Sequence, residues 1–332
     1  MDLEFQRLTQ LSFGYWNAQP LFVMAELDVF NILDKLNTAS IEKLAEHIQS
    51  NTPYLEGLLN AGVAQGILSK NQENYSNSTL SERFLISRSQ ESLLNWVRVM
   101  GRWVEPWTQL KQVIVTGNMA ENRSARLGED KVYTTEFILG MHEYARRTSD
   151  LVAQEITLPR KAKLVDVGGG AGTYSIALCK LYEDITCTLI DVPFVTDIAI
   201  TTLKVHGFDT RVSCENRDYS CDAFGSRDQD AILFSNVLHQ ESPQMVKNML
   251  KRGSDALVRG GQIVVHGHFI NADRTSPSFS VLHNLSAYVL WGSGRSYTVA
   301  EMKALMEEVG LKDVHLKKPK GSTTELLIGY VN

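Results

Sequence analysis

The stretch LVDVGGGAGTYS, residues 164–175, decides how the chain folds. It begins as a buried strand with one acid, turns on glycine at positions 168, 169, 170 and 172, and then continues with a helical pattern. Because glycine has no Cβ, such a turn lets a ligand lie on the main chain and lets the next helix begin close against the strand. A glycine turn after the first strand of an open α/β sheet lies at the edge where ligands bind.

The sequence that follows this turn alternates between strand and helix patterns. Residues 161–269 contain the apolar runs KLVDVGG, TCTLIDV, TRVSCEN, DAILFSNVL and GQIVVHGHF, separated by helical stretches such as TYSIALCKLY and SPQMVKNMLKRGSDALV. This alternation predicts a mostly parallel sheet with helices on both faces. The final segment, VHLKKPKGSTTELLIGYV, predicts two strands that pair antiparallel at the edge of that sheet.

The first third of the chain has a different, helical pattern. Apolar residues recur at three- and four-residue spacing, and Ser40 and Pro53 are suited to the starts of two consecutive helices. Two short extended pieces around KNQEN follow, so we expect a helix-turn-helix with a small β-wing. We predict a winged-helix domain over residues 1–100, a helical connector over residues 101–160 and a catalytic α/β domain over residues 161–332.

A winged helix commonly binds DNA through basic residues on its second helix. Here that segment, TPYLEGLLNAGVAQGIL, has an acid at Glu56 and no basic residue before Lys70, and the whole chain has a formal charge of -5. Phosphate binding needs a concentrated basic surface, so nucleic acid is not an expected partner. The small and apolar faces favour contact with another protein chain, and we expect this domain to mediate homodimerisation.

Composition limits the cellular context further. No apolar run is long enough to cross a bilayer, and the N-terminal MDLEFQRLTQ lacks the pattern of a secretory signal. The four cysteines show no C-x-x-C spacing, so we expect reduced thiols. These features indicate a cytoplasmic protein with small-molecule partners.

The glycine loop is compatible with more than one kind of ligand. A dinucleotide site requires G-x-G-x-x-G, but counting from Gly168 or from Gly170 places Thr173 or Ser175 at the last position. The pattern that fits has Asp166 followed by glycine at every second position, and a strand acid favours a cationic or amine-bearing ligand over a pyrophosphate.

Two later strand ends carry further acids. Asp191, about twenty residues beyond the loop, is placed to accept hydrogen bonds from a ribose diol. Asp218 closes the third strand where an adenine amino group would lie, and Tyr219 beside it can stack. Acids at the ends of three successive predicted strands favour a nucleoside site over a simple tight turn.

At this point the chain resembles the S-adenosylmethionine-dependent methyltransferases, and within them the plant-type small-molecule O-methyltransferases of plants and bacteria. The resemblance covers nearly the whole chain, including VDVGGGAGTYS, IDVP, RDY and NVLHQES. It implies a Rossmann-like seven-stranded methyltransferase sheet, a mostly helical N-terminal winged-helix dimerisation domain, and S-adenosylmethionine as cofactor. The cofactor-binding residues predicted on this basis are Asp166, Gly168, Gly170, Asp191, Asp218, Tyr219 and Ser235.

The resemblance also points to a catalytic residue. This family has its catalytic histidine in a Leu-His-Asp-Trp sequence after the fourth strand, and His239 matches it, followed here by Gln240 and Glu241. Methyl transfer from a sulfonium is an in-line displacement that needs the acceptor aligned and its proton removed. A histidine with a pKa near 6.5 can take the proton of a phenol as the bond forms. We therefore predict His239 as the general base.

The chain departs from the family where two glutamates would orient the histidine, since those places hold Gly267 and Gly294. His266, His268 and His283 are candidates to form a polar cluster with His239. Such a cluster is also compatible with a metal, although no ligand spacing specifies one and no metal is predicted.

The acceptor pocket is expected to be apolar, because the connector helices roof the acceptor site in this family. Its predicted residues are Trp103, Tyr133, Phe137, Met141, His268, His283 and Trp291. We expect methyl transfer to a hydroxyl of an aromatic or polyketide-like molecule in secondary metabolism. The alternatives left open are transfer to carbon or nitrogen, a non-methylating reaction on the same fold, and a winged-helix DNA-binding regulator.

Overall fold

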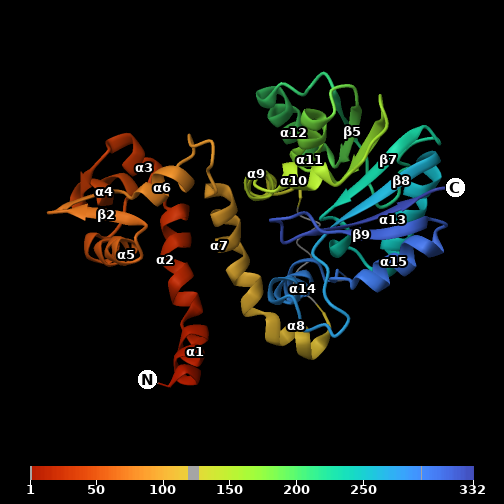
Figure 1. Ribbon diagram of the computed structural model, residues 1–332. Helices are drawn as coiled ribbons and strands as arrows, with labels where there is room; N and C mark the ends of the chain where they lie inside the picture. The colour runs from red at the N-terminus through yellow and green to blue at the C-terminus, as the bar shows by residue number, and fades with distance from the viewer. Residues whose placement is uncertain (1, 119–126, 293) are drawn as a thin grey trace. The chain divides into compact units, whose positions relative to one another are not determined.

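The computed structural model describes residues 2–118, 127–292 and 294–332, which group into two compact units, residues 1–104 and 105–332 (Figure 1). Within the first unit, seventeen buried side chains form one hydrophobic core. The second unit has a core on each face of its large sheet.

The first unit is mostly helical with a small sheet. Ser40 Oγ accepts a hydrogen bond from the Lys43 amide at the start of α4, and Pro53 lies in the first turn of α5. The sheet has the order β1-β3-β2, with β2 and β3 antiparallel, so the expected helix-turn-helix with a β-wing is confirmed. The elements are α1 (Leu3–Ser12), α2 (Gly14–Glu26), α3 (Val29–Leu36), β1 (Ala39–Ser40), α4 (Ile41–Ile48), α5 (Thr52–Ala64), β2 (Leu68–Asn71), β3 (Asn74–Asn77), α6 (Thr79–Phe84) and α7 (Leu94–Thr108).

Helices α8 (Leu110–Thr116), α9 (Lys131–Ala145) and α10 (Ser149–Gln154) precede the large sheet. The sequence pattern predicts one helix across residues 135–156, whereas the structure divides it between α9 and α10. The Thr148 and Ser149 hydroxyls donate to nearby carbonyl oxygens at this break, which offers the backbone an alternative to helical hydrogen bonds.

The large sheet has seven strands in the order β6-β5-β4-β7-β8-β10-β9. Neighbours pair parallel except that β10 runs antiparallel to both β8 and β9. This confirms the predicted Rossmann-like seven-stranded sheet. Its elements are β4 (Lys163–Val167), α11 (Thr173–Leu181), β5 (Thr186–Asp191), α12 (Pro193–His206), β6 (Val212–Asn216), β7 (Gln229–Ser235), η2 (Leu238–Gln240), α13 (Pro243–Ala256), β8 (Leu257–Gly267), α14 (Ser278–Trp291), α15 (Val299–Glu308), β9 (Lys312–Lys317) and β10 (Glu325–Tyr330).

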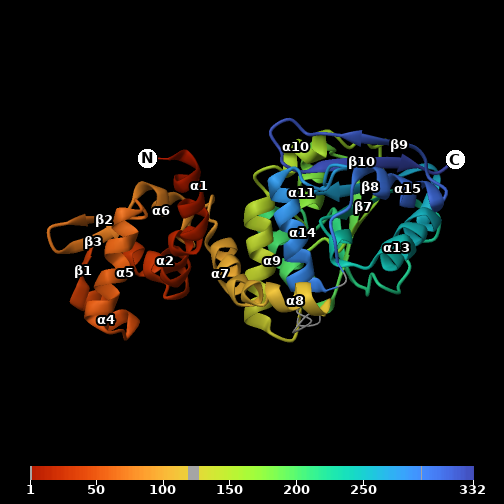
Figure 2. The same ribbon diagram turned by 90° about the horizontal axis from the view of Figure 1, so that it is seen from below.

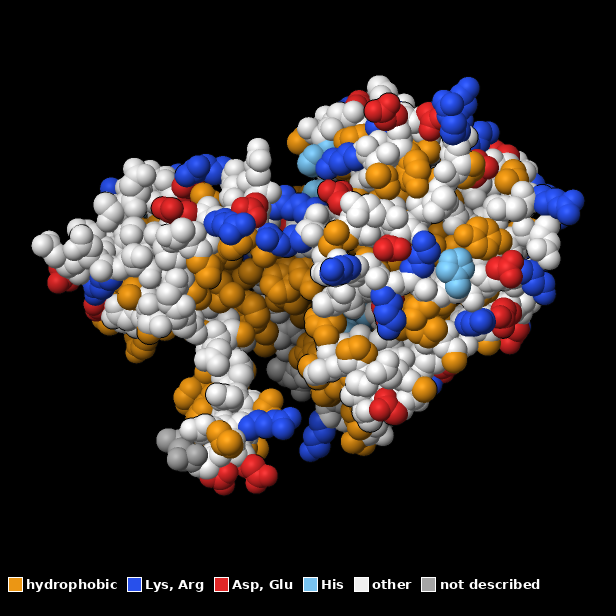
Figure 3. All heavy atoms as spheres, viewed as in Figure 1, with side chains coloured by type: hydrophobic (Ala, Val, Ile, Leu, Met, Phe, Trp, Pro, Cys, Tyr) orange, Lys and Arg blue, Asp and Glu red, His pale blue; other side chains and the backbone are white. Residues whose placement is uncertain are grey.

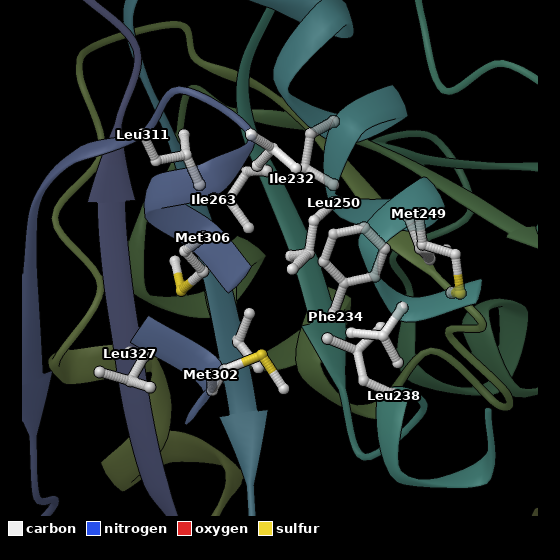
Figure 4. Packing of buried hydrophobic residues seen from close by; sticks show 14 of the residues in the cluster. Ile232, Phe234, Leu238, Met249, Leu250, Ile263, Met302, Met306, Leu311 and Leu327 are labelled. Carbon is white, nitrogen blue, oxygen red and sulfur yellow. The ribbon is translucent and has the colours of Figure 1, made fainter. Parts of the chain in front are cut away.

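The central strand β7 is buried on both faces because its side chains alternate between two cores. Ile232 and Phe234 belong to the cluster that includes Met249 of α13 and Met302 of α15, and Figure 4 shows these side chains packed together. Leu233 belongs to the opposite cluster, which includes residues of α10, α11 and α12. The sheet is therefore held rigidly, and its carboxyl edge positions the site.

Three differences from the sequence prediction affect the site. Helix α14 was not expected, and α8 packs against it (Figures 1 and 2). Strand β7 ends at Ser235, before its apolar run DAILFSNVL ends at Leu238, and His239 lies in the short 3₁₀ turn η2 that follows. Helix α13 ends at Ala256, earlier than its apolar pattern indicates, because β8 begins directly at Leu257. Among the described residues, no helix is both long and apolar enough to span a membrane.

Candidate active site

The glycine loop after β4 uses its glycines for different purposes. Gly168, Gly170 and Gly172 have positive φ angles of 64°, 56° and 82°, a conformation that side chains with a Cβ rarely adopt. A Cβ at Gly169 would lie 2.7 Å from Leu189 Cγ, so this glycine lets β5 pack against the loop. A Cβ at Gly170 would meet one side-chain atom, 4.0 Å away. Space for a ligand is thus found at Gly170, whereas Gly169 serves packing.

Asp166 lies on β4 just before the loop and is 1% exposed. Its Oδ2 accepts a hydrogen bond of 2.7 Å from Ser175 Oγ, which ties the first turn of α11 to the strand. Its Oδ1 is buried and has no hydrogen-bond partner among the described residues. Burial raises the pKa of Asp166 to about 6. One oxygen of this carboxyl is therefore committed to the fold.

Asp191 ends β5, the strand next to β4. Its Oδ2 accepts from the Gly170 amide at 3.0 Å, and its Oδ1 accepts from the Val192 amide at 2.8 Å. Burial raises its pKa to about 6 against the opposing effect of these two hydrogen bonds. Asp191 thus fixes the open part of the glycine loop from the neighbouring strand, and each oxygen keeps a second lone pair.

Asp218 and Tyr219 follow β6. Asp218 is exposed, and a hydrogen bond from Ser220 lowers the pKa of its carboxyl. Tyr219 is half-buried with its hydroxyl 3.5 Å from Glu241 Oε1. Arg252 of α13 donates to the main-chain carbonyls of Tyr219 and Ser220 at 2.6 and 2.7 Å. Sequence reasoning missed Arg252, because nothing in the pattern links α13 to this loop.

Ser235 ends β7, and its hydroxyl lies 2.8 Å from His266 Nδ1. His266 Nε2 lies 2.7 Å from Thr324 Oγ1, so both nitrogens of this ring have partners. Burial lowers the pKa of His266 to about 3. The expectation that His266 joins His239 and His268 in one ring cluster is therefore wrong, because the strand points it toward Ser235 and Thr324.

A cluster of aromatic and imidazole rings surrounds His239. Its ring centroid lies 4.6 Å from that of His283 and 5.2 Å from that of Trp291, both on α14. The His268 ring, after β8, lies 5.2 Å from His283 and 4.7 Å from Phe279. The structure thus brings together His239 from η2, His268 from the segment after β8, and His283 and Trp291 from α14. We refer to the three imidazoles, His239, His268 and His283, as the histidine cluster.

Burial makes the histidine cluster weakly basic. It lowers the pKa of His239 well below its usual value, and it lowers those of His268 and His283 to about 4. All three rings are therefore neutral near pH 7. Within the described residues, no group of three or more His, Cys, Asp or Glu side chains is arranged to hold a metal ion.

The positions of the two absent glutamates lie beside the cluster. A Cβ at Gly294 would collide with the carbonyl oxygen of His239, so no side chain fits there without moving the backbone. A Cβ at Gly267 would lie 3.6 Å from Asn236 Oδ1. Glycine at 294 therefore lets the segment after α14 pack directly against the turn that carries His239.

The remaining predicted pocket residues lie on two helices, α7 and α9. Trp103 belongs to α7 within residues 1–104, whereas Tyr133, Phe137 and Met141 belong to α9 in the second unit. The rings of Tyr133 and Phe137 stack with centroids 6.0 Å apart, and Phe137 is buried.

Helix α9 is attached to the glycine loop by a contact that the sequence did not indicate. His142 Nδ1 lies 2.9 Å from Thr173 Oγ1, the first residue of α11. Burial lowers the pKa of His142 to about 4. The helix that carries predicted pocket residues is thus positioned by the same loop that carries Gly170.

A polar groove of about 650 Å³ lies over β5 and β6 and the loop before β7. It contains none of the predicted site residues. Its charged residues include Arg217, which is paired with Glu215, and Lys163, which is paired with Asp228.

The comparisons with known proteins agree with this architecture. The O-methyltransferase domain family matches residues 118–312, and the O-methyltransferase dimerisation domain family matches residues 9–87. The chain is 25% identical over 312 residues to a 3-hydroxy-5-methyl-1-naphthoate 3-O-methyltransferase of Streptomyces sahachiroi, with 92% of this chain and 89% of the relative covered. It is 23% identical over 313 residues to an N,N-dimethyltransferase, OxyT, of Streptomyces rimosus, covering 92% and 90%. Human N-acetylserotonin methyltransferase, solved in complex with S-adenosylmethionine, superposes with a TM-score of 0.87 at 22% identity, covering 100% and 99% of the two chains.

The chain therefore belongs to the S-adenosylmethionine-dependent O-methyltransferase family. The residues present fit this cofactor: the loop is open at Gly170, a carboxylate ends β5, and a buried oxygen of Asp166 has no partner among the described residues. The protein is an enzyme, an S-adenosylmethionine-dependent O-methyltransferase.

Proposed function

We propose that this enzyme transfers a methyl group to a hydroxyl of an aromatic or polyketide-like small molecule of secondary metabolism, with His239 as general base. The observation that carries the proposal is the place of His239. It follows β7, the strand directly beside the glycine-loop strand β4, and its partly buried ring lies against the rings of His283 and Trp291.

The nucleoside end of the site is assigned to residues at three neighbouring strand ends. In this proposal Gly168, Gly170 and Ser235 line the methionine portion and Asp191 accepts hydrogen bonds from the ribose hydroxyls. Asp218 and Tyr219 contact the adenine. Asp166 holds α11 in place through its bond to Ser175, and its second oxygen, which has no partner among the described residues, faces the cationic or amine-bearing part of the ligand in this proposal.

S-Adenosylmethionine, when bound, supplies a methyl group on a positively charged sulfur. The chain has to hold the acceptor in line and remove the hydroxyl proton. His239 removes that proton, because one of its ring nitrogens accepts it as the oxygen forms its bond to carbon. Since burial lowers its pKa, the ring is neutral at physiological pH, and it accepts the proton as the bond to carbon forms.

The acceptor is expected to be flat and largely apolar. Trp291, Phe137 and Tyr133 offer aromatic surface, and the histidine cluster carries no charge near pH 7. Such a lining favours an aromatic molecule held by ring contacts and a few hydrogen bonds. The naphthoate substrate of the Streptomyces sahachiroi relative is of this kind.

We also propose that the enzyme is a homodimer through its first unit. Helix α1 buries none of its own residues, and Leu3, Leu8 and Leu11 are 79%, 64% and 74% exposed. Figure 3 shows hydrophobic side chains on the surface of this helix. An exposed apolar helix within a dimerisation family domain is suited to a second copy of the chain.

The proposed reaction is tested by product analysis together with a variant of the base. The enzyme is incubated with S-adenosylmethionine and a panel of phenols, aromatic amines and carbon acids, because one relative is an N,N-dimethyltransferase. We expect O-methylated phenols by mass spectrometry and a loss of about 10²–10⁴-fold in kcat for His239→Phe. S-Adenosylhomocysteine binding, measured by calorimetry, should be unchanged in that variant. Wild-type turnover by His239→Phe would remove this residue from the mechanism.

A further inference from the structure

A chain of hydrogen bonds runs from the carboxyl end of β7 across β8 to the segment before β10. These three strands are neighbours in the sheet (Figure 2), and their register places Ser235 beside His266. The Ser235 hydroxyl lies 2.8 Å from His266 Nδ1, and His266 Nε2 lies 2.7 Å from Thr324 Oγ1. Thr324 Oγ1 in turn lies 2.7 Å from Ser322 Oγ. The chain therefore connects a predicted cofactor residue to a partly exposed serine.

The His266 ring can pass hydrogen bonds along this chain in two directions. It is 2% exposed, and burial lowers its pKa to about 3, so the ring is neutral near pH 7. A neutral imidazole has one N–H donor and one acceptor nitrogen, and each nitrogen of His266 has a hydroxyl partner. In the inward direction His266 donates to Ser235, and in the outward direction it donates to Thr324.

The bonds of Ser322 favour the inward direction. Ser322 Oγ accepts a hydrogen bond of 3.1 Å from the Thr324 amide. In the inward direction the Ser322 O–H donates to Thr324 Oγ1, the Thr324 O–H donates to His266 Nε2, and each hydroxyl both donates and accepts. The outward direction would instead aim two donors of Thr324 at the one oxygen of Ser322.

The direction of the chain decides what Ser235 can bind. The amino-acid end of S-adenosylmethionine carries an ammonium and a carboxylate. In the proposed site the cationic part faces Asp166 Oδ1, which no described residue bonds, so the carboxylate still needs a donor. A Ser235 hydroxyl that accepts from His266 keeps its O–H for that carboxylate, and Ser235 is only half-buried.

Tyr174 holds the His266 ring from the side of the glycine loop. It is the second residue of α11, which begins directly after Gly172. Its ring packs edge-on against His266 with centroids 5.0 Å apart, and its hydroxyl interacts with Ser235. The His266 ring is thus fixed by hydrogen bonds within the sheet and by packing against the helix after the loop.

We propose that His266 is a positioning residue for the cofactor: it donates a hydrogen bond to Ser235 and so directs the Ser235 O–H at the carboxylate of the methionine portion. The inference rests on the proposed assignment of Ser235 to that portion. Thr324 and Ser322 keep the His266 proton on Nδ1. No covalent bond is made or broken by this chain.

Thr324 offers a matched pair of variants in the full-length enzyme. Thr324→Val keeps the shape of the side chain and removes the hydroxyl that donates to His266 Nε2, whereas Thr324→Ser keeps the hydroxyl and removes a methyl group. Both variants retain the Thr324 amide that donates to Ser322. Thermal unfolding verifies that each variant is folded.

The first measurement compares two ligands by calorimetry. S-Adenosylhomocysteine has the amino-acid end, and methylthioadenosine lacks it. We expect Thr324→Val to weaken S-adenosylhomocysteine binding by about 2–10-fold, the effect of losing one hydrogen bond, while methylthioadenosine binding stays unchanged and Thr324→Ser resembles the wild type. Wild-type affinity in Thr324→Val, an equal loss in both variants, or an equal loss for both ligands would overturn the proposal.

The second measurement needs neither turnover nor a change in affinity. The ¹⁵N chemical shifts of the His266 ring report its tautomer in the S-adenosylhomocysteine complex at neutral pH. We expect the proton on Nδ1 in the wild type and in Thr324→Ser, and a mixture of tautomers in Thr324→Val. A proton on Nε2 in the wild-type complex overturns the proposal by itself.

A failure of the Ser235 assignment is recognised separately. We expect Ser235→Ala to weaken S-adenosylhomocysteine binding by about 10–100-fold, because a charge-assisted hydrogen bond is lost. Wild-type affinity in Ser235→Ala removes that assignment and the role of His266 with it. A loss in Ser235→Ala without a loss in Thr324→Val overturns the role of His266 alone. Methylation of phenols is measured independently of both.

Discussion

The glycine loop and the histidine cluster lie at the ends of adjacent strands, yet they are built differently. In the loop, the residues that matter lie close in sequence, and their polar atoms are largely held by the fold: Asp191 accepts two amides, and Asp166 accepts Ser175. In the cluster, three imidazoles come from η2, the segment after β8 and α14, and the Nδ1 atoms of His268 and His283 have no partner among the described residues.

This difference shows how the cofactor-binding part and the acceptor-facing part of the site are each determined by the sequence. The part that holds a common cofactor is shaped by backbone geometry, which few substitutions preserve. The part that faces the acceptor is assembled from side chains on separate elements, so its chemistry can change while the fold persists. Gly294 illustrates this, because its lack of a side chain brings another segment against His239.

The buried histidines and the loop carboxyls should change the free energy of unfolding in opposite directions as pH falls. This pH dependence is the largest effect we expect. The pKa of His142, His268 and His283 is lowered to about 4, that of His266 to about 3, and that of His239 also falls. The stability they contribute is present above pH 6.5 and is lost as pH falls toward 4, at about 1.4 kcal/mol per pH unit for each histidine.

The loop carboxyls work in the opposite direction. The pKa of Asp166 and Asp191 is raised from 3.8 to about 6, so the stability they contribute is present below pH 3.8 and is lost as pH rises through 6. Because the histidines outnumber these carboxyls, we expect the free energy of unfolding to drop by several kcal/mol between pH 7 and pH 5. Urea unfolding at several pH values in this range measures the free energy of unfolding. A constant or rising stability on acidification would contradict the assigned burial of the histidines.

Two glycine variants test whether packing or backbone conformation contributes more to the stability of the loop. Gly169→Ala places a methyl group 2.7 Å from Leu189 Cγ, and we expect overpacking to lower the free energy of unfolding by about 1–3 kcal/mol. Gly170→Ala meets little steric contact but has a φ of 56°, so its cost should be about 1 kcal/mol. Thermal or urea unfolding compares the two variants. A larger cost for Gly170→Ala would show that backbone conformation, and not packing, governs the loop.

A further effect of similar size concerns cofactor affinity. Asp191→Asn should weaken S-adenosylhomocysteine binding by about 1–2 kcal/mol, because a charged acceptor of hydrogen bonds becomes neutral. In the wild type, affinity should also fall as pH drops below about 6, where Asp191 takes up a proton. Calorimetric titration at about pH 7.5 and about pH 5.5, on either side of that pKa, tests both statements. If Asp191→Asn keeps the wild-type affinity, the ribose assignment is wrong.

Much of the fold could be predicted from local pattern. The apolar runs and the glycine turn indicated the parallel sheet, and Ser40 and Pro53 marked the helices of the winged domain correctly. Helix α14 was missed, although it supplies His283 and Trp291. Its hydrophobic residues are spread around the helix and give little amphipathic period, and its ends carry weak signals, with Pro277 before it and Gly292 after it.

The sequence by itself determined the class of protein, the strand alternation and the ligand edge, because glycine, buried acids and apolar period act through local backbone geometry. Tertiary structure decided the partners: His266 joined Ser235 and Thr324, His142 met Thr173, and His283 met His239. These contacts join residues 31 to 58 positions apart in the chain. Such pairings are set by how strands and helices pack, and no local pattern encodes them.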